Sequence, residues 1–236
     1  ILSIGRSPVH KRLFFKFQSI TTTQMKIALE AFPDVPWAFV FRHPVQTLMS
    51  HLDPKKGGGG NAPCLRSKRA PPEKVKAILR STGASSSSPN AAWCAAHLNM
   101  LCEHAYEAFE KYGVYDHSSA DSFKNSINEG YIRINSEEIS KLVNSGSQRG
   151  FLIDYATLPG ILPRFLLQAF GIQPSNEWVS QMVYESQQYS KGARRNSKAG
   201  IFNGDSEDKE KRATEEIEKW GKLVLQPTTN KLLINS

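Results

Sequence analysis

The sequence predicts an α/β fold in three layers, with a central parallel sheet between layers of helices. Continuous apolar runs such as Trp37–Phe41 (WAFVF) are typical of parallel strands that are buried on both faces. Helical patterns alternate with these runs, as crossover connections between parallel strands require. The length of 236 residues suits a single domain, so we expect one domain over residues 1–236.

The predicted helices and strands follow from apolar runs, from the periodicity of apolar residues and from residues that suit helix ends. Strands are expected at Leu13–Phe17, Trp37–Phe41, Tyr131–Ile134 and Phe151–Tyr155, and helices at Gln24–Phe32, Val45–Leu52, Asn90–Lys111, Leu158–Phe170, Ser175–Tyr189 and Glu207–Leu223. Pro44 suits a first helical turn, and Gly171 suits a helix end. The long helix at 90–111 has an apolar face of Trp93, Leu101, Ala105 and Phe109.

Residues 53–89 differ in composition from the rest of the chain. Gly57–Gly60, Pro71-Pro72 and Ser85–Ser88 interrupt a basic segment. Stretches of this kind are typical of loops and linkers. We therefore expect a mobile insertion here, with one short helix at Glu73–Arg80.

Charge and cysteine content narrow the function only in part. The formal net charge of +8 favours anionic partners in general. The three cysteines are an odd number without CxxC spacing, which argues against a disulfide framework or a zinc ribbon and fits a reducing compartment. Cys94, His97 and His104 share a helical face without a carboxylate, a spacing more typical of packing than of a metal site. We see no signal peptide and no apolar run of about 18 residues that would span a bilayer.

The most informative segment is Arg42–Ser50, RHPVQTLMS. An arginine ends a buried strand here, and a serine lies two turns into the following helix. In parallel α/β folds, ligands bind beyond the carboxyl ends of the strands. Arginine can hold a phosphate with a bidentate fork, and a helix start adds backbone donors. The same residues would also suit an arginine at a sheet edge and an ordinary helical serine, and chemistry alone leaves both interpretations open.

This segment resembles the R-x-P-x-x-x-x-x-S element of sulfotransferases, which have a P-loop NTPase-like fold. The resemblance implies that Arg42 and Ser50 bind the 3′-phosphate of the donor, 3′-phosphoadenosine 5′-phosphosulfate. The preceding strand and its proline-rich approach, FPDVPW, are also similar to the family's. No metal is implied.

Three other stretches are similar to parts of the same family. LFFKFQS resembles the strand that carries a catalytic lysine, which falls on Lys16; Gln18 stands where a histidine base is common. FLIDYATL resembles the strand that ends in a tyrosine near the donor adenine, here Tyr155. YSKGARR resembles the basic loop that closes over the 3′-phosphate, and its positions fall on Lys191, Gly192, Arg194 and Arg195. From the residues alone, an edge lysine is the simpler interpretation of Lys16, and a packed tyrosine and a solvated basic turn stay open as interpretations of the other two stretches.

One part of the family pattern has no counterpart in the chain. These enzymes cradle the 5′-phosphosulfate in a Gly-rich loop that precedes the lysine strand, and no such loop precedes Lys16. We therefore expect a domain that is incomplete at its N-terminus and a chain that is catalytically inactive by itself.

The resemblance implies sulfuryl transfer from the donor to a hydroxyl or amine of a small-molecule or glycan acceptor, in the cytoplasm or the Golgi lumen. The general base is not assigned, and His10, His43 and His51 are the candidates that lie near the motifs in the sequence. The alternative is a non-catalytic basic protein of the same fold that recognises anionic glycan or nucleic acid; no specific nucleic acid is expected for the enzyme. A nucleotide kinase would need a Walker lysine, which we do not find.

Overall fold

A parallel pair of strands lies at the centre of the protein. The computed structural model describes residues 14–53, 62–84, 88–113, 148–158, 160–162, 166–186 and 206–236. Within them, β1 (Trp37–Phe41) pairs with β2 (Gly150–Asp154) so that Trp37 lies opposite Gly150 and Phe41 opposite Asp154. A Cβ atom at position 150 would lie 2.5 Å from the Trp37 ring, so glycine allows this close approach. The predicted strand at 37–41 is confirmed, and that at 151–155 is confirmed with a shift of one residue.

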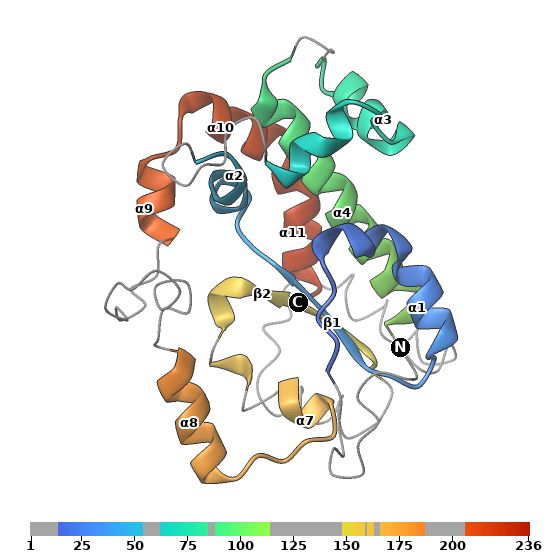
Figure 1. Ribbon diagram of the computed structural model, residues 1–236, viewed down its shortest axis with the longest axis vertical. Helices are drawn as coiled ribbons and strands as arrows, with labels where there is room; N and C mark the ends of the chain where they lie inside the picture. Colours follow the sequence, from blue (N-terminus) through green and yellow to red (C-terminus); the bar gives the residue numbers. More distant parts are fainter. Residues whose placement is uncertain are drawn as a thin grey trace.

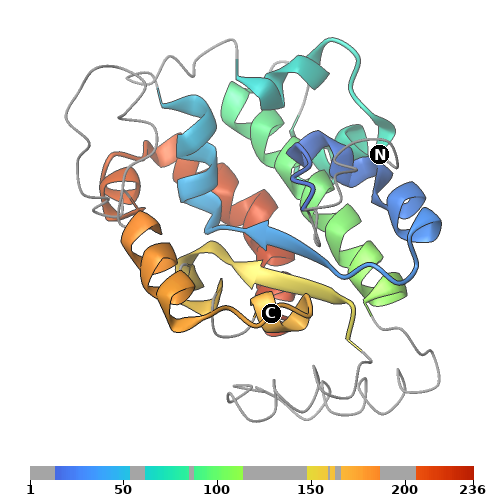
Figure 2. The same cartoon turned by 60° about the horizontal axis from the view of Figure 1, so that its bottom comes forward.

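Helical segments cover both faces of this pair. Side chains alternate along a strand, so Phe39, Phe41 and Leu152 pack against α4 and α11, while Ala38, Phe151 and Ile153 pack against the segment that carries α7. Figure 2 shows the strands between these two groups of helices. The described residues are mostly helical around two parallel strands, and the three-layer P-loop-like sheet stays a prediction.

The helices follow the periodic segments of the sequence. Their bounds are η1 Ser19–Gln24, α1 Met25–Ala31, α2 Pro44–Leu52, η3 Pro63–Lys68, α3 Glu73–Ser81, α4 Asn90–Tyr112, η4 Tyr155–Thr157, α7 Leu167–Ala169, α8 Asn176–Ser186, α9 Ser206–Lys211, α10 Glu215–Trp220, the π-helical turn η7 Gly221–Leu225 and α11 Gln226–Ile234 (Figure 1). Ser175 caps α8 by accepting from the Trp178 amide at 3.2 Å, and Gly171 has a φ of 67°. None of these helices has the length and apolar character needed to cross a membrane.

The largest core cluster forms around α4, whose Trp93 and Leu101 are buried as predicted. The described part of the predicted insertion belongs to this core. Cys64, Leu65, Val75 and Leu79 are buried and bring η3 and α3 onto α4. Residues 62–84 are therefore packed against the domain, and the mobility of the insertion at 53–89 stays a prediction.

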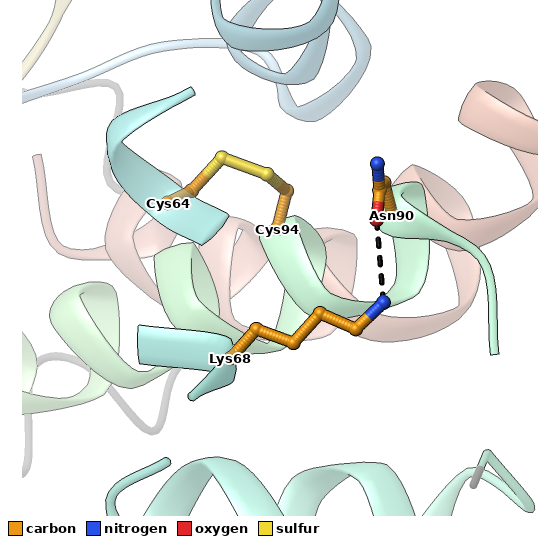
Figure 3. The surroundings of a disulfide bond; sticks show 4 residues. All are labelled: Cys64, Lys68, Asn90 and Cys94. Carbon is orange, nitrogen blue, oxygen red and sulfur yellow. Dashed lines mark hydrogen bonds between the residues drawn. A yellow bond between two sulfur atoms is a disulfide. The ribbon is translucent and has the colours of Figure 1, made fainter. Parts of the chain in front are cut away.

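A disulfide joins η3 to α4 at Cys64 and Cys94 (Figure 3). The two Cα atoms are 4.9 Å apart, both side chains are buried, and Cys102 stays a free thiol. The expectation that the cysteines form no disulfide is wrong for this pair. An odd count leaves one cysteine over but does not prevent two others from meeting when their elements pack together.

Two segments differ from the predicted elements. Residues 14–18, in the predicted strand at 13–17, form neither helix nor strand, and Phe14 and Phe17 are exposed. A strand needs hydrogen bonds from a neighbouring strand, and the described residues place none beside this segment. The predicted helix at 207–223 divides into α9 and α10, because Thr214 accepts from the Ile217 amide and caps a new helix.

Two further predictions fall partly or wholly outside the described residues. The strand predicted at 131–134 lies outside them. Of the helix predicted at 158–170, residues 159 and 163–165 lie outside them, and α7 is the helix described within it.

A buried arginine joins α1 to the start of β2. Arg149 is 4% exposed, and its guanidinium donates to the carbonyls of Leu29 at 2.8 Å, Phe32 at 2.5 Å and Val35 at 3.1 Å. The last carbonyls of a helix lack intrahelical partners. Arg149 therefore closes the end of α1 and fixes the approach to β1.

Candidate functional site

A cleft of about 330 Å³ lies beyond the carboxyl ends of β1 and β2. The ends of the two strands, the first turn of α2 and one side of α11 form its wall. The polar residues that line it include Arg42, His43, Gln46, Asp154, Tyr155 and Asn230. This is the edge of a parallel sheet at which ligands bind in α/β folds.

Arg42 and Tyr155 meet in this cleft. Arg42 directly follows β1 and Tyr155 directly follows β2, so the parallel register of the strands brings them together. The guanidinium carbon of Arg42 lies 4.7 Å from the centre of the Tyr155 ring, a cation–π distance. Arg42 Nε also donates to Gln46 Oε1 at 2.7 Å, which fixes the plane of the guanidinium.

The turn after β2 is shaped by Asp154. Its Oδ1 accepts from the Ala156 amide at 3.0 Å, and its carbonyl accepts from the Thr157 hydroxyl at 2.7 Å. Asp154 thus turns the chain into η4 and presents the Tyr155 ring, which is 37% exposed, to the cleft.

The wall formed by α11 was not predicted from the sequence. Gln226 and Asn230 lie one turn apart on this helix, and both line the cleft. A four-residue spacing of amides was visible in the sequence, but Pro227 and the polar run that follows it gave no clear helical periodicity. Pro227 is accommodated because it lies in the first turn of α11, where its missing N–H costs little.

Ser50 lies two turns along α2 and does not line the cleft. Its hydroxyl donates to the Gln46 carbonyl at 2.8 Å and accepts from Lys209 Nζ at 3.0 Å. The predicted pair of Arg42 and Ser50 therefore does not meet in the cleft itself. The two residues are connected through Gln46, which bonds to Arg42 with its side chain and to Ser50 with its backbone.

The remaining predicted site residues are less informative. Lys16 is exposed in the segment 14–18 and does not line the cleft. The basic-loop residues Lys191, Gly192, Arg194 and Arg195 lie outside the described residues. The roles of these five residues stay predictions.

The histidines named as possible bases lie in different surroundings. His43 lines the cleft, and its Nδ1 is 3.5 Å from Glu210 Oε1. His51 does not line the cleft, and burial lowers its pKa below the ordinary value. Burial also lowers the pKa of His97, and the neighbouring His51 lowers it further. His10 lies outside the described residues.

The described residues offer no cluster of three or more metal-ligating side chains. The group of Cys94, His97 and His104 has lost its thiolate, because Cys94 is bonded to Cys64. The groups in the cleft are instead a guanidinium, an exposed aromatic ring and side-chain amides. This combination is suited to a planar polar ring and an oxyanion.

Comparison with known proteins finds no matching family model, no matching curated protein and no matching solved structure.

Proposed function

We propose that the protein is sulfotransferase-like and that the cleft beyond β1 and β2 binds the 3′-phosphoadenosine part of 3′-phosphoadenosine 5′-phosphosulfate. The observation that carries the proposal is the meeting of Arg42 and Tyr155 in one cleft. Similarity to the family implies a phosphate contact for Arg42 and an adenine contact for Tyr155. These two contacts must be adjacent if a single nucleotide is to make both.

The chemistry of the cleft supports the same proposal. An arginine fork suits a phosphate, and an exposed tyrosine ring offers a stacking surface for a base. The first turn of α2 adds backbone N–H groups and a favourable dipole for an anion. Phe41, at the end of β1, and Val45, in the first turn of α2, are both buried at this point.

The proposed reaction is in-line transfer of a sulfuryl group to a hydroxyl or amine. The acceptor oxygen or nitrogen forms a bond to sulfur while the bond between sulfur and the 5′-phosphate oxygen breaks, and that oxygen leaves with the electron pair. The protein contributes positioning and charge stabilisation. Lys16 would stabilise the leaving oxygen, and the acceptor loses its proton to a base that is not assigned.

Calorimetric titration with 3′-phosphoadenosine 5′-phosphate and with adenosine 5′-phosphate tests the proposal. The first ligand should bind at least about tenfold more tightly, since a charge-assisted phosphate contact contributes about 1.5 to 3 kcal/mol. The alternative, a basic binding protein for anionic glycan or nucleic acid, predicts weak and strongly salt-dependent binding of both nucleotides without preference for the 3′-phosphate. That outcome would overturn the enzyme proposal and favour the binding protein.

A further inference from the structure

One wall of the cleft is a single face of α11. Gln226, Asn230 and Leu233 all line the cleft, and they follow one another at steps of four and three residues. Side chains at these steps are neighbours on one helical face, with about 5 to 6 Å between their Cβ atoms. This face, the amide wall, presents two side-chain amides and one apolar side chain to the same space as the Tyr155 ring.

The other side of α11 fixes the rotation of this helix. Leu232 is fully buried in one apolar cluster with Phe41 and Leu152, which belong to β1 and β2. A helix that is held to the strands on this side has one orientation about its own axis. The packing of Leu232 therefore keeps Gln226 and Asn230 at the cleft.

The π-helical turn η7 leads directly into α11. A π turn takes about one more residue than an α turn, so the residues after it move onto a different face of the helix, and such turns are frequent at functional sites. Gly221 begins this turn, and a Cβ atom there would lie 3.3 Å from a methyl group of Val45. The turn thus lies against the first turn of α2 and sets which residues of α11 line the cleft.

The two amides are available to a ligand. Gln226 is half-buried and Asn230 is exposed, and the part of the chain that the structure describes offers neither side chain a hydrogen bond. A side-chain amide combines an oxygen that accepts with an NH₂ group that donates. Adenine carries the complementary pair, a 6-amino group that donates beside a ring nitrogen that accepts, and asparagine and glutamine recognise adenine in this way in nucleic acids.

We propose that the amide wall selects the base of the nucleotide. The base stacks on Tyr155, and its edge meets Gln226 and Asn230. An amide oxygen accepts from the 6-amino group of adenine, and an amide NH₂ group donates to a ring nitrogen. The identification of the ligand as an adenine nucleotide rests on the proposed function, whereas the place of the amide wall in the cleft does not.

A base without the 6-amino group separates recognition from packing. Unsubstituted purine keeps the ring nitrogens and the stacking surface of adenine, but it gives the amide oxygen no donor. We expect the wild type to bind an adenine nucleotide about fivefold to tenfold more tightly than the matching purine nucleotide, as for a base edge that no longer fits its amide partner. Without the amides this ratio should fall to about one. A purely structural role of α11 would lower both affinities equally and keep the ratio.

The test is a calorimetric titration with four ligands: adenosine and purine riboside, each as the 5′-phosphate and as the 3′,5′-bisphosphate. The proteins are the wild type, Gln226→Met, Asn230→Leu and the variant with both changes. Methionine and leucine are good helix formers, so α11 should be kept; Asn230→Ala replaces Asn230→Leu if circular dichroism shows that the latter is unfolded. Gln168→Leu is the matched control, because it removes an exposed amide from α7, whose segment packs on the opposite face of the strands from α11.

The outcomes separate this inference from the proposed function. Each single variant should lower the adenine-to-purine ratio, the double variant should abolish it, and Gln168→Leu should keep it. A wild type without this preference, or a double variant that keeps it, would overturn the amide wall even if the 3′-phosphate is preferred. A preference for adenine that depends on the amides, without any preference for the 3′-phosphate, would keep the amide wall and overturn the sulfotransferase proposal. Binding of none of the four ligands would overturn both.

Discussion

The Arg42 guanidinium lies over the Tyr155 ring at 4.7 Å, although the two residues follow strands that are distant in the sequence. The last residues of those strands, Phe41 and Asp154, are direct partners in the parallel register. The pairing of the strands therefore determines the contact. At a partly exposed site such a cation–π contact contributes only about 0.5 to 1 kcal/mol, so its main effect is to orient the guanidinium.

Replacement of the Tyr155 ring should weaken nucleotide binding. We expect Tyr155→Leu to lower the affinity for 3′-phosphoadenosine 5′-phosphate about fivefold to tenfold, because base stacking on an aromatic side chain contributes about 1 to 3 kcal/mol. Tyr155→Phe keeps the ring and should bind nearly as the wild type does. Calorimetry of both variants measures this, and equal losses would assign the effect to the phenol hydroxyl instead of the ring.

Loss of Arg149 should destabilise the domain. Arg149→Met leaves the carbonyls of Leu29, Phe32 and Val35 without this donor. We expect the free energy of unfolding to fall by about 2 to 4 kcal/mol, the range for a buried charged group whose hydrogen bonds are broken. Urea unfolding measures the change, with Arg80→Met on the exposed side of α3 as the control. A fall in the free energy of unfolding as small as that of Arg80→Met would show that Arg149 contributes little to stability.

The disulfide should be detectable by counting thiols. Unfolded, unreduced protein should expose one thiol, that of Cys102, and unfolded, reduced protein should expose three. In the folded protein, burial and the nearby Glu103 raise the pKa of Cys102 to about 12, so alkylation at neutral pH should be slow. Three thiols before reduction would rule out the bond.

The same disulfide should stabilise the fold. It closes a loop across a sequence separation of 30 residues. In the loop-entropy account, closing a loop of this size stabilises the folded protein by about 3 to 4 kcal/mol relative to the reduced chain. Cys64→Ala with Cys94→Ala should lower the free energy of unfolding by a comparable amount, whereas Cys102→Ala leaves the bond intact.

Acidification should destabilise the protein through the buried histidines. Burial, with a smaller effect of His51, holds the pKa of His97 below its ordinary value of 6.5. The unfolded chain therefore binds protons first as pH falls, and stability that is present above about pH 6.5 decreases below it. His97→Gln should flatten this dependence when unfolding free energies are measured between pH 7.5 and 5.5. A slope as steep as that of the wild type would assign the effect to other groups.

The elements with strong local signals were predictable from the sequence. The run WAFVF became β1, Pro44 opened α2, and the apolar face with Trp93 and Leu101 identified α4. In each case the local pattern and the packing agree. The cleft could be predicted as far as Arg42 and Tyr155, because strand ends in a parallel sheet share an edge.

The remaining features depend on contacts between distant segments. Lys209 belongs to a lysine–glutamate pattern that is typical of a solvated helix face, yet it is buried because α9 packs against the polar face of α2. Cys64 and Cys94 meet only when η3 folds onto α4. Residues 14–18 have the composition of a strand, but an apolar run forms a strand only beside another strand.

The most direct test of the proposed site compares two ligands in two proteins. The affinities of 3′-phosphoadenosine 5′-phosphate and adenosine 5′-phosphate are measured by calorimetry for the wild type and for Arg42→Met. We predict that Arg42→Met weakens binding of the 3′-phosphorylated ligand by about 2 to 4 kcal/mol and leaves the other ligand nearly unaffected, so that the preference for the 3′-phosphate disappears. An unchanged preference in Arg42→Met, or a wild type without any preference, would contradict the assignment of this cleft to the nucleotide.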